Sequence, residues 1–463
     1  MSIQTDTIAA VATPAGPGAI GILRLSGPRA ADIAAAVFRP LGKKGLLDRP
    51  VRTLVYGDLL DREGQVIDRV LCTYSRGPES YTGEDTAELH CHGSPMVLTL
   101  GLEALFAQGA RQAGPGEFTQ RAFLNGRLDL AQAEAVADLL DAQSREGARH
   151  AAGQLSGALS RRVGEIYSAL VDLMAHFHAV LDYPDEDIDP FTQEQLARDL
   201  TRQETALERL LATYRRGRQL SRGVRCAIVG RPNAGKSSLL NALVGYDRAI
   251  VTDIPGTTRD IVEETVNLGD VVLRLADTAG IRDTENLVER IGVDIALGRL
   301  QKAELAIAVF DLSEPLSAED GRILQELSER EIPTVAVLNK NDLPPVWDPS
   351  VISARFPHTL TLSAGGSEAD QESALSALNR EIASLLSLSG FDPNEAMLAN
   401  ERQRACAAEA AELLSDVCGT IEAGYTLDAV DVALESALSA LFRLTGEKVS
   451  DRVVDEVDRK SVV

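Results

Sequence analysis

Residues 230–237 have the types and spacing that a phosphate-binding loop needs. They read Gly-Arg-Pro-Asn-Ala-Gly-Lys-Ser and fit the pattern G-x-x-x-x-G-K-S, between an apolar run at 224–229 and a helix-favouring run at 238–243. In such a loop, backbone N–H groups and the helix N-terminus surround a phosphate, the lysine reaches the β- and γ-phosphates, and the serine hydroxyl binds Mg²⁺. We therefore predict a nucleotide site with Ser237 as a Mg²⁺ ligand. The residues of this loop that we expect to contact the nucleotide are Asn233, Ala234, Gly235, Lys236, Ser237 and Ser238.

Three shorter motifs follow in the order that GTP recognition requires. The motif at 277–280 follows an apolar run at 271–276, which would place Asp277 beside the metal through a water molecule and the Gly280 N–H against the γ-phosphate. After the run at 334–338, the Asp342 carboxylate can accept both N–H groups of guanine N1 and N2, a pair that adenine lacks. Backbone N–H groups at 363–364 would contact guanine O6. The predicted contacts are Asp277, Thr278, Ala279, Gly280, Asn339, Lys340, Asp342, Ser363 and Ala364.

Residues 252–260, Thr-Asp-Ile-Pro-Gly-Thr-Thr-Arg-Asp, lie where a switch I segment belongs. Thr258 would be the second Mg²⁺ ligand, ordered when the γ-phosphate is present. Where a Ras-like GTPase has a water-orienting glutamine, this chain has Ile281, so hydrolysis needs another group. Glu289 is a candidate to orient or activate the water. The predicted nucleotide contacts of this segment are Thr252, Asp253, Ile254, Pro255, Gly256, Thr257 and Thr258.

The elements that would position these motifs fall into three blocks. Between about 222 and 386, apolar runs alternate with helical stretches, which predicts a parallel sheet covered on both faces. The runs are 224–229, 271–276, 305–310, 334–338 and 359–362. Proline-free, helix-periodic segments flank this block, at 118–183 with a further helix near 193–214, and at 394–457. We expect an α/β domain inserted in a helical one, whose halves meet in space.

Residues 1 to about 118 mix short strand-like runs with turn signals, which predicts a compact α+β domain. The expected strands are 20–25, 51–56, 70–74 and 87–92, and the expected helices are 30–37 and 97–106. His90 and His92 would project from one face of a strand, where a metal pair is conceivable. No third ligand is near in sequence, so packing beside a ligand pocket is the favoured interpretation.

Composition fits a multidomain globular protein. The chain has 463 residues, of which 44% are hydrophobic and 25% charged, and its five cysteines are scattered without C-x-x-C spacing. No apolar run reaches the roughly 18 to 20 residues of a membrane span, and the N-terminus has no signal-peptide pattern, so we expect a cytoplasmic protein. The formal charge of −23 opposes unspecific attraction to phosphates. Any nucleic acid must therefore dock on a local basic patch or be delivered by a partner.

Over nearly its whole length, the chain resembles the MnmE family of tRNA-modifying GTPases, also called TrmE. The motifs that carry the resemblance lie mostly outside the α/β block, at 6–10, 21–27, 80–85, 115–119, 121–125, 128–135 and 184–188. The resemblance implies an N-terminal folate-binding and dimerisation domain at 1–118, a discontinuous all-α helical domain at 119–221 and 387–463, and an inserted Ras-like P-loop G domain at 222–386.

The resemblance also implies a mechanism. The protein would be a homodimer whose G domains meet across K⁺, which takes the place of an arginine finger. The K⁺ ligands would be Asn233, Thr252, Ile254 and Thr257, and the family's catalytic glutamate matches Glu289. The N-terminal domain would bind 5-formyl-tetrahydrofolate, or a related one-carbon folate, through Arg24, Glu88 and Arg127. With the flavin-binding partner MnmG (GidA), as a heterotetramer, the family adds an aminomethyl or carboxymethylaminomethyl group to C5 of the wobble uridine of certain tRNAs.

One departure and one alternative complete these expectations. Family members end in Phe-Cys-x-Gly-Lys, whereas this chain ends in residues 458–463, Asp-Arg-Lys-Ser-Val-Val, which we interpret as non-native. The alternative to tRNA modification is a ribosome-assembly switch GTPase that binds RNA and performs no carbon chemistry. A protein of that class would have an appended basic RNA-binding domain. Here an acidic chain instead has its G domain inserted among helices.

Overall fold

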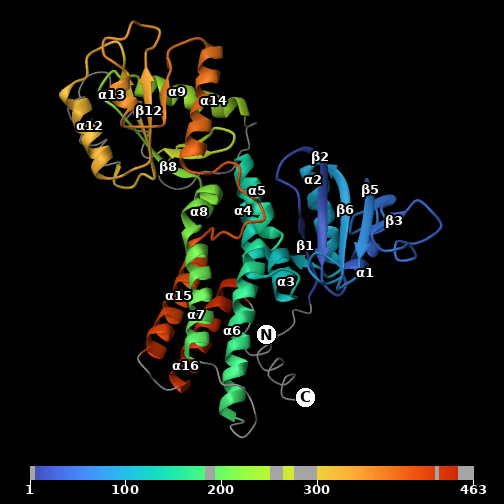
Figure 1. Cartoon of the computed structure of the whole chain (residues 1–463). Coiled ribbons are helices and arrows are strands. Elements are labelled where there is room, and N and C mark those ends of the chain that lie inside the picture. Colours follow the sequence, from blue (N-terminus) through green and yellow to red (C-terminus); the bar gives the residue numbers. More distant parts are fainter. Residues whose placement is uncertain (1–5, 183–192, 251–263, 276–299, 423–426, 447–463) are drawn as a thin grey trace. The chain divides into compact units, whose positions relative to one another are not determined.

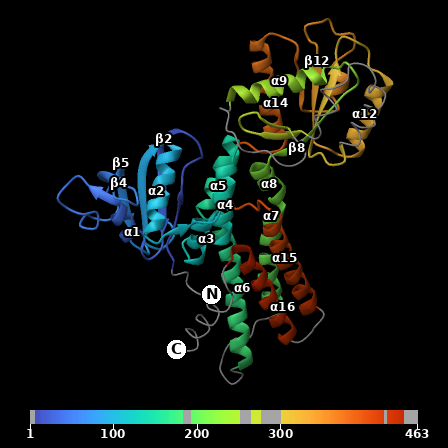
Figure 2. The same ribbon diagram turned by 180° about the vertical axis from the view of Figure 1, so that it is seen from behind.

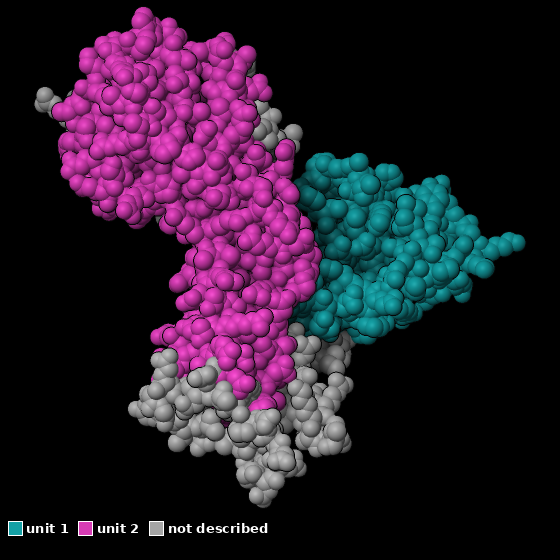
Figure 3. Space-filling view, viewed as in Figure 1, with its two compact units in different colours: residues 1–133 teal, residues 134–463 magenta. Residues whose placement is uncertain are grey.

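The structure is a computed structural model that describes residues 6–182, 193–250, 264–275, 300–422 and 427–446. It divides into two compact units, residues 1–133 and residues 134–463 (Figure 3). None of the described helices combines the length and apolar character that a membrane span requires.

The first unit is built on an antiparallel sheet with one parallel edge strand. The described strands follow the order β3-β4-β5-β6-β2-β1-β7, in which only the β1–β7 pair is parallel. They are β1 (Ile8–Val11), β2 (Gly18–Ser26), β3 (Phe38–Pro40), β4 (Val55–Leu60), β5 (Val66–Ser75), β6 (Thr86–Gly93) and β7 (Arg111–Gln112). Helices α1 (Ala30–Val37) and α2 (Pro95–Ala107) share a core with alternate residues of these strands. The sheet therefore has one covered face and one open face.

Most of the predicted elements of this unit are present. The strands expected at 20–25, 70–74 and 87–92 and the helices expected at 30–37 and 97–106 lie within β2, β5, β6, α1 and α2. The strand expected at 51–56 begins only at Val55, because the chain turns at Arg52, whose φ of 61° is not compatible with a strand.

Helix α3 (Glu117–Leu124) belongs to the first unit because a buried arginine ties it there. The Arg121 side chain is 2% exposed and pairs with Asp6 at 2.8 Å, Glu84 at 3.0 Å and Glu117 at 3.1 Å. Hydrogen bonding from Arg111 holds the pKa of Glu117 down to about 2, so this carboxylate stays ionised in the network. The compact unit thus extends beyond residue 118, where the sequence suggested a boundary.

The second unit contains the two helical segments that flank the α/β block. The first comprises α4 (Leu130–Asp141, which begins just before the unit), α5 (Arg145–Leu155), α6 (Ala158–Asp182), α7 (Gln193–Ala212) and α8 (Tyr214–Arg222). The second comprises α15 (Glu401–Glu422) and α16 (Leu427–Thr445). Helix α7 packs against α15, and α6 packs against α16 (Figures 1 and 2). The helical segments before and after the α/β block in the sequence therefore pack against each other.

The α/β block has the predicted parallel sheet. Its described strands follow the order β13-β12-β11-β8-β10-β9, and all neighbours are parallel except the β9–β10 hairpin. The strands are β8 (Val224–Val229), β9 (Glu264–Asn267), β10 (Val272–Leu275), β11 (Leu305–Asp311), β12 (Thr334–Asn339) and β13 (Thr359–Thr361). The helices are α9 (Lys236–Ile250), α12 (Ala318–Glu329), α13 (Ser350–Ser353) and α14 (Glu368–Leu385). Strand β9 is an addition to the elements that the sequence predicted.

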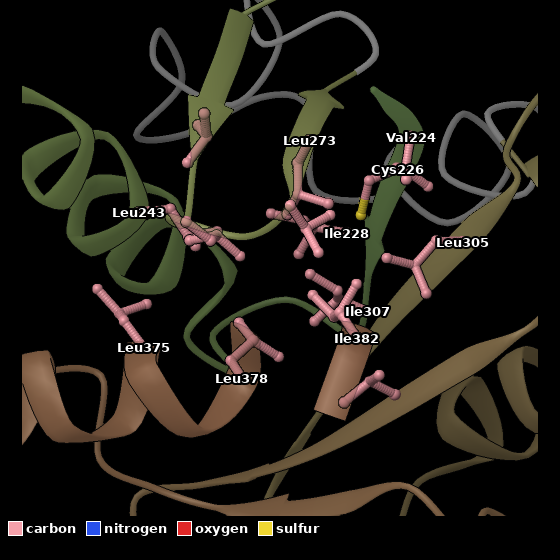
Figure 4. Packing of buried hydrophobic residues seen from close by; sticks show 14 of the residues in the cluster. Val224, Cys226, Ile228, Leu243, Leu273, Leu305, Ile307, Leu375, Leu378 and Ile382 are labelled. Carbon is pink, nitrogen blue, oxygen red and sulfur yellow. The ribbon is translucent and has the colours of Figure 1, made fainter. Parts of the chain in front are cut away.

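Helices cover both faces of this sheet. Cys226 and Ile228 of β8 pack with α9 and α14 in the cluster shown in Figure 4. The alternate residues Ala227 and Val229 face the other way, into a cluster with α12 and α13. Burial on both faces explains why the strands are continuous apolar runs and not alternating ones.

The turn of the β9–β10 hairpin is held by the helical segment. The Asn267 side-chain amide donates to the carbonyl of Gln143, and the Arg145 N–H donates to the Gly269 carbonyl at 3.0 Å. Asp270 accepts from Asn379 of α14 at 3.0 Å. The connection between α4 and α5 therefore anchors the hairpin.

Candidate nucleotide-binding site

Loops at the carboxyl edge of the parallel sheet form a pocket of about 390 Å³. Strands β8, β12 and β13 run parallel, so the loops that follow them meet at one edge. The pocket brings together three of the predicted motifs. Its lining includes Asn233, Gly235, Lys236, Ser237, Ser238, Asn339, Lys340, Asp342, Ser363 and Gly365. Gly365 was not predicted, although it continues the turn that begins at Ser363.

The phosphate loop has the backbone that anion binding requires. Asn233 and Gly235 have positive φ values of 63° and 101°, and helix α9 begins at Lys236 directly after them. A Cβ at Gly235 would lie 1.9 Å from Asn339 Nδ2, so only glycine fits there. The first-turn N–H groups of α9 have no carbonyl partner within the helix and can bind phosphate oxygens. The Lys236 ammonium donates to the Arg231 carbonyl at 2.6 Å and lines the pocket.

Asn339 joins the loops of the pocket. Its side chain is buried, and its Nδ2 donates to the Ala234 carbonyl at 2.8 Å. Its Oδ1 accepts from the Ala364 N–H at 2.9 Å. Asn339 therefore bridges the phosphate loop and the turn at 363–365. Because the Ala364 N–H is engaged in this bridge, a contact with guanine O6 requires that bond to be exchanged.

A buried carboxylate that the sequence analysis missed also supports the pocket. Asp311 ends β11, accepts from Lys340 Nζ at 2.6 Å and lies 3.6 Å from an Arg231 guanidinium nitrogen. Burial alone would raise the pKa of Asp311, but hydrogen bonds from Lys340 and Ser313 outweigh it and hold the pKa below its ordinary value. Asp311 therefore remains a charged partner for two loops. An acid at the end of a fully apolar strand was the signal for it.

Asp342 is positioned for base recognition. Its side chain is exposed at the pocket, and no hydrogen bond or ion pair joins its carboxylate to a described residue. Both carboxylate oxygens are therefore available to a ligand that offers two N–H groups.

Several predicted residues lie outside the described part of the chain. These are the Mg²⁺ and K⁺ candidates of the switch I segment, the 277–280 motif and the candidate water-orienting glutamate. They comprise Thr252, Asp253, Ile254, Pro255, Gly256, Thr257, Thr258, Asp277, Thr278, Ala279, Gly280 and Glu289. Their roles stay predictions.

The first unit places two of the three folate candidates together. Arg24 of β2 pairs with Glu88 of β6 at 2.8 Å, and the two residues are partners in the strand register. Burial would raise the pKa of Glu88, but hydrogen bonds from His90 and Arg24 outweigh it and lower the pKa. Arg127 is exposed, and its stem lies beside Gly83. Among the described residues, no hydrogen bond or ion pair joins Arg127 to Arg24 or Glu88.

The two histidines of β6 have acidic partners. His90 Nε2 lies 3.2 Å from Glu88 Oε2, and His92 Nδ1 lies 2.8 Å from Asp68 Oδ1. They share a face of the strand, as predicted, since the residues between and beside them are buried on the other face. Within the described residues, no group of three or more histidine, cysteine, aspartate or glutamate side chains could hold a metal ion.

The sheet order, the phosphate loop at its carboxyl edge and the exposed Asp342 together define a P-loop protein of the GTP-binding class. The chain belongs to the MnmE family. The family model described as MnmE helical domain matches residues 130–459, and the model described as GTP-binding protein TrmE N-terminus matches residues 7–127.

Curated relatives match this chain over almost its full length. The protein from Chloroflexus aurantiacus is 43% identical and that from Heliobacterium modesticaldum is 41% identical, each covering 98% of this chain and 98% of the relative. The protein from Clostridioides difficile is 38% identical and covers 98% of this chain and 97% of the relative. All three are named tRNA modification GTPase MnmE. Among solved structures, the G domain of the T. maritima FeoB iron transporter is 22% identical with a TM-score of 0.25, covering 35% of this chain and 98% of that chain.

The Asn339 bridge generates a test. Asn339→Ala leaves the Ala234 carbonyl and the Ala364 N–H without their partner, and each buried unpaired group costs about 1 to 3 kcal/mol. We expect the affinities for GTP and GDP to fall by roughly tenfold or more, measured by titration with a fluorescent guanine nucleotide. Asn341→Ala is the matched control, because this neighbouring asparagine is exposed and should leave both affinities within about twofold. Equal affinities for the two variants would contradict the bridging role.

Proposed function

We propose that this protein binds and hydrolyses GTP and couples hydrolysis to the modification of tRNA. The observation that carries the proposal is the pocket in which the phosphate loop and the Asp342 carboxylate lie together. Full-length relatives named tRNA modification GTPase MnmE support the second half of it.

The metal chemistry is proposed from the residues around the phosphate loop. Ser237 lines the pocket beside Lys236 in the first turn of α9, and its hydroxyl oxygen is a hard ligand of the kind that Mg²⁺ prefers. Thr258 would supply the second Mg²⁺ ligand. Mg²⁺ bound there would neutralise charge on the phosphates. Asn233 is exposed at the pocket and would hold K⁺ together with Thr252, Ile254 and Thr257.

Hydrolysis requires a positioned water molecule as well as held phosphates. Lys236 and the first-turn N–H groups of α9 would bind the phosphate oxygens, on which negative charge develops in the transition state. Glu289 would orient the attacking water or accept its proton. Asp277 and the Gly280 N–H would complete the γ-phosphate contacts.

The one-carbon chemistry is proposed for the first unit. Arg24, Glu88 and Arg127 would bind 5-formyl-tetrahydrofolate, and the arginine and carboxylate side chains suit a ligand with a glutamate tail and a pterin that both donates and accepts hydrogen bonds. The product would be an aminomethyl or carboxymethylaminomethyl group on C5 of the wobble uridine, made with the flavin-binding partner MnmG.

The open face of the first unit's sheet supports a homodimer. Tyr56, Leu71 and His90 are neighbours in the strand register, and Tyr56 and Leu71 are 52% and 37% exposed. Exposed apolar side chains in adjacent register positions are typical of a surface that another protein covers. A second copy of the chain would cover this face through its own N-terminal unit.

Guanine selection is tested by Asp342→Asn. The amide can no longer accept two N–H groups, so GTP affinity should fall by at least about tenfold while xanthosine triphosphate, which offers a carbonyl in place of the N2 amine, binds better than it does to the wild type. Competition titrations with the two nucleotides measure both changes. Unchanged GTP affinity would refute the assignment of Asp342.

Glu289 is tested by comparing turnover with binding. Glu289→Ala should reduce GTP turnover in KCl roughly 100-fold with little change in nucleotide affinity, because the carboxylate acts mainly in the transition state. Glu372→Ala, at an exposed position of α14, is the control and should hydrolyse GTP as the wild type does. Replacement of KCl by NaCl should slow the wild type. Lost GTP affinity in the glutamate variant would instead indicate a structural role.

Folate binding separates the proposal from a ribosome-assembly GTPase. Isothermal titration with 5-formyl-tetrahydrofolate should give binding to the wild-type protein and at least about tenfold weaker binding to Arg127→Ala, which loses a charged hydrogen-bond donor. Arg62→Ala removes an exposed arginine elsewhere in the same unit and should bind as the wild type does. Absence of folate binding in a protein that binds GTP normally would favour the assembly class.

A further inference from the structure

A basic groove lies between α6 and α7 in the helical part of the second unit. It has a volume of about 720 Å³, and its charged lining consists of Arg162, Arg198, Arg202, Arg209 and a single acid, Glu165. The remaining lining residues are alanine, threonine and glutamine. We call these four arginines and the groove they line the arginine groove. The chain as a whole has a formal charge of −23, so the arginine groove is a local region of positive charge on an acidic protein.

The arrangement of α7 concentrates the arginines. At 100° per residue, Arg198, Arg202 and Arg209 fall within an arc of about 40° on the helix surface. Three acids of α7, Asp199, Glu204 and Glu208, lie about 60° or more outside that arc. The three arginines of α7 therefore share one face of the helix, and that face lines the groove.

Two of the arginines are available to a ligand. Arg162 pairs with Glu165 of its own helix at 2.7 Å, which consumes the one acid of the lining. Arg202 and Arg209 are exposed, and no hydrogen bond or ion pair joins either guanidinium to a described residue. They are seven residues apart on one helix and therefore about 10 Å apart along its axis, a distance that lets them contact separate phosphates.

We propose that the arginine groove binds the phosphate backbone of RNA. This inference rests on the proposed function, which requires the protein to engage a folded RNA despite its acidic surface. The arginine guanidinium group forms bidentate hydrogen bonds with phosphate oxygens, and threonine and glutamine side chains also donate hydrogen bonds to phosphates. The groove would hold the protein on the backbone of the nucleic acid, where contacts carry no sequence information.

The lining favours RNA over an acidic protein partner. The cores of protein interfaces are enriched in aromatic and methionine side chains, whereas nucleic-acid interfaces are polar and strongly positive. Among the described residues that line the groove, alanine is the largest apolar residue and none is aromatic. A protein partner could form ion pairs with these arginines, but the lining offers it no large apolar side chain to pack against.

The test is a charge reversal at the two available arginines. The double variant Arg202→Glu, Arg209→Glu should bind folded tRNA at least tenfold more weakly than the wild type, measured by fluorescence anisotropy with a labelled transcript. Two lost phosphate contacts should also reduce the slope of log affinity against log salt by about 1.4 to 1.8. GTP hydrolysis without RNA should be unchanged, because neither arginine lies at the nucleotide pocket.

The matched control is the double variant Arg355→Glu, Arg380→Glu. These two arginines are exposed in the α/β block and change the net charge by the same amount. The control should keep tRNA affinity within about threefold and keep the salt slope of the wild type. Equal losses in the two double variants would overturn the inference, since a general charge effect would then explain them.

The outcomes distinguish this inference from the proposed function. If the wild type and the groove variant bind tRNA equally well, the proposed role of the arginine groove is wrong and the proposed function is unaffected. Poly-glutamate serves as a probe for an acidic protein partner. If the groove variant keeps its tRNA affinity but no longer binds poly-glutamate, the groove is a protein-binding site and the RNA proposal is wrong. A wild-type protein that hydrolyses GTP but binds neither tRNA nor folate would overturn both.

Discussion

The nucleotide pocket depends on the two hydrogen bonds of one buried amide. Asn339 donates to the carbonyl of Ala234 and accepts from the N–H of Ala364, so the end of β12 fixes the loop after β8 and the loop after β13 at the same time. Gly235 makes this possible, because any side chain there would displace the Asn339 amide. Phosphate binding and base recognition therefore share one rigid support, and neither loop can shift without loss of a buried hydrogen bond.

Buried charge supplies a second tie in the same place. Asp311 is almost fully buried, and it contacts both Lys340 of the base-recognition loop and Arg231 of the phosphate loop. Removal of one partner would leave a charge in a poorly solvated position, which is strongly destabilising. The first unit contains a similar buried network, in which Arg121 forms ion pairs with Asp6, Glu84 and Glu117. In both units, buried ion pairs fix loops that strands and helices alone would leave separate.

Local sequence predicted the parts of this architecture that local physics determines. The parallel strands of the α/β block and the phosphate loop follow from apolar runs and from glycine spacing, and the structure contains them close to the expected bounds. The antiparallel strand β9 and the short strands β1, β3 and β7 were missed, because their formation depends on partners distant in sequence. Asp311 and Arg121 were missed for the same reason, since their partners lie up to 115 residues away. Arg24 and Glu88 were named as candidates only through the family resemblance, and their ion pair was not predicted.

The anchored hairpin determines how the nucleotide pocket can influence the helical segment. Strand β9 follows the predicted switch I segment in the chain, and β10 leads directly to the predicted motif at 277–280. Both strands are only four residues long, and Asn267 and Gly269 of their turn are bonded to Gln143 and Arg145. A displacement at the nucleotide end of β9 or β10 would therefore be transmitted along a short strand to the hydrogen bonds with the α4–α5 connection. Because Asp270 is bonded to Asn379, the hairpin is also held from α14. Any movement of the turn would therefore break hydrogen bonds on the helical side or on the α14 side.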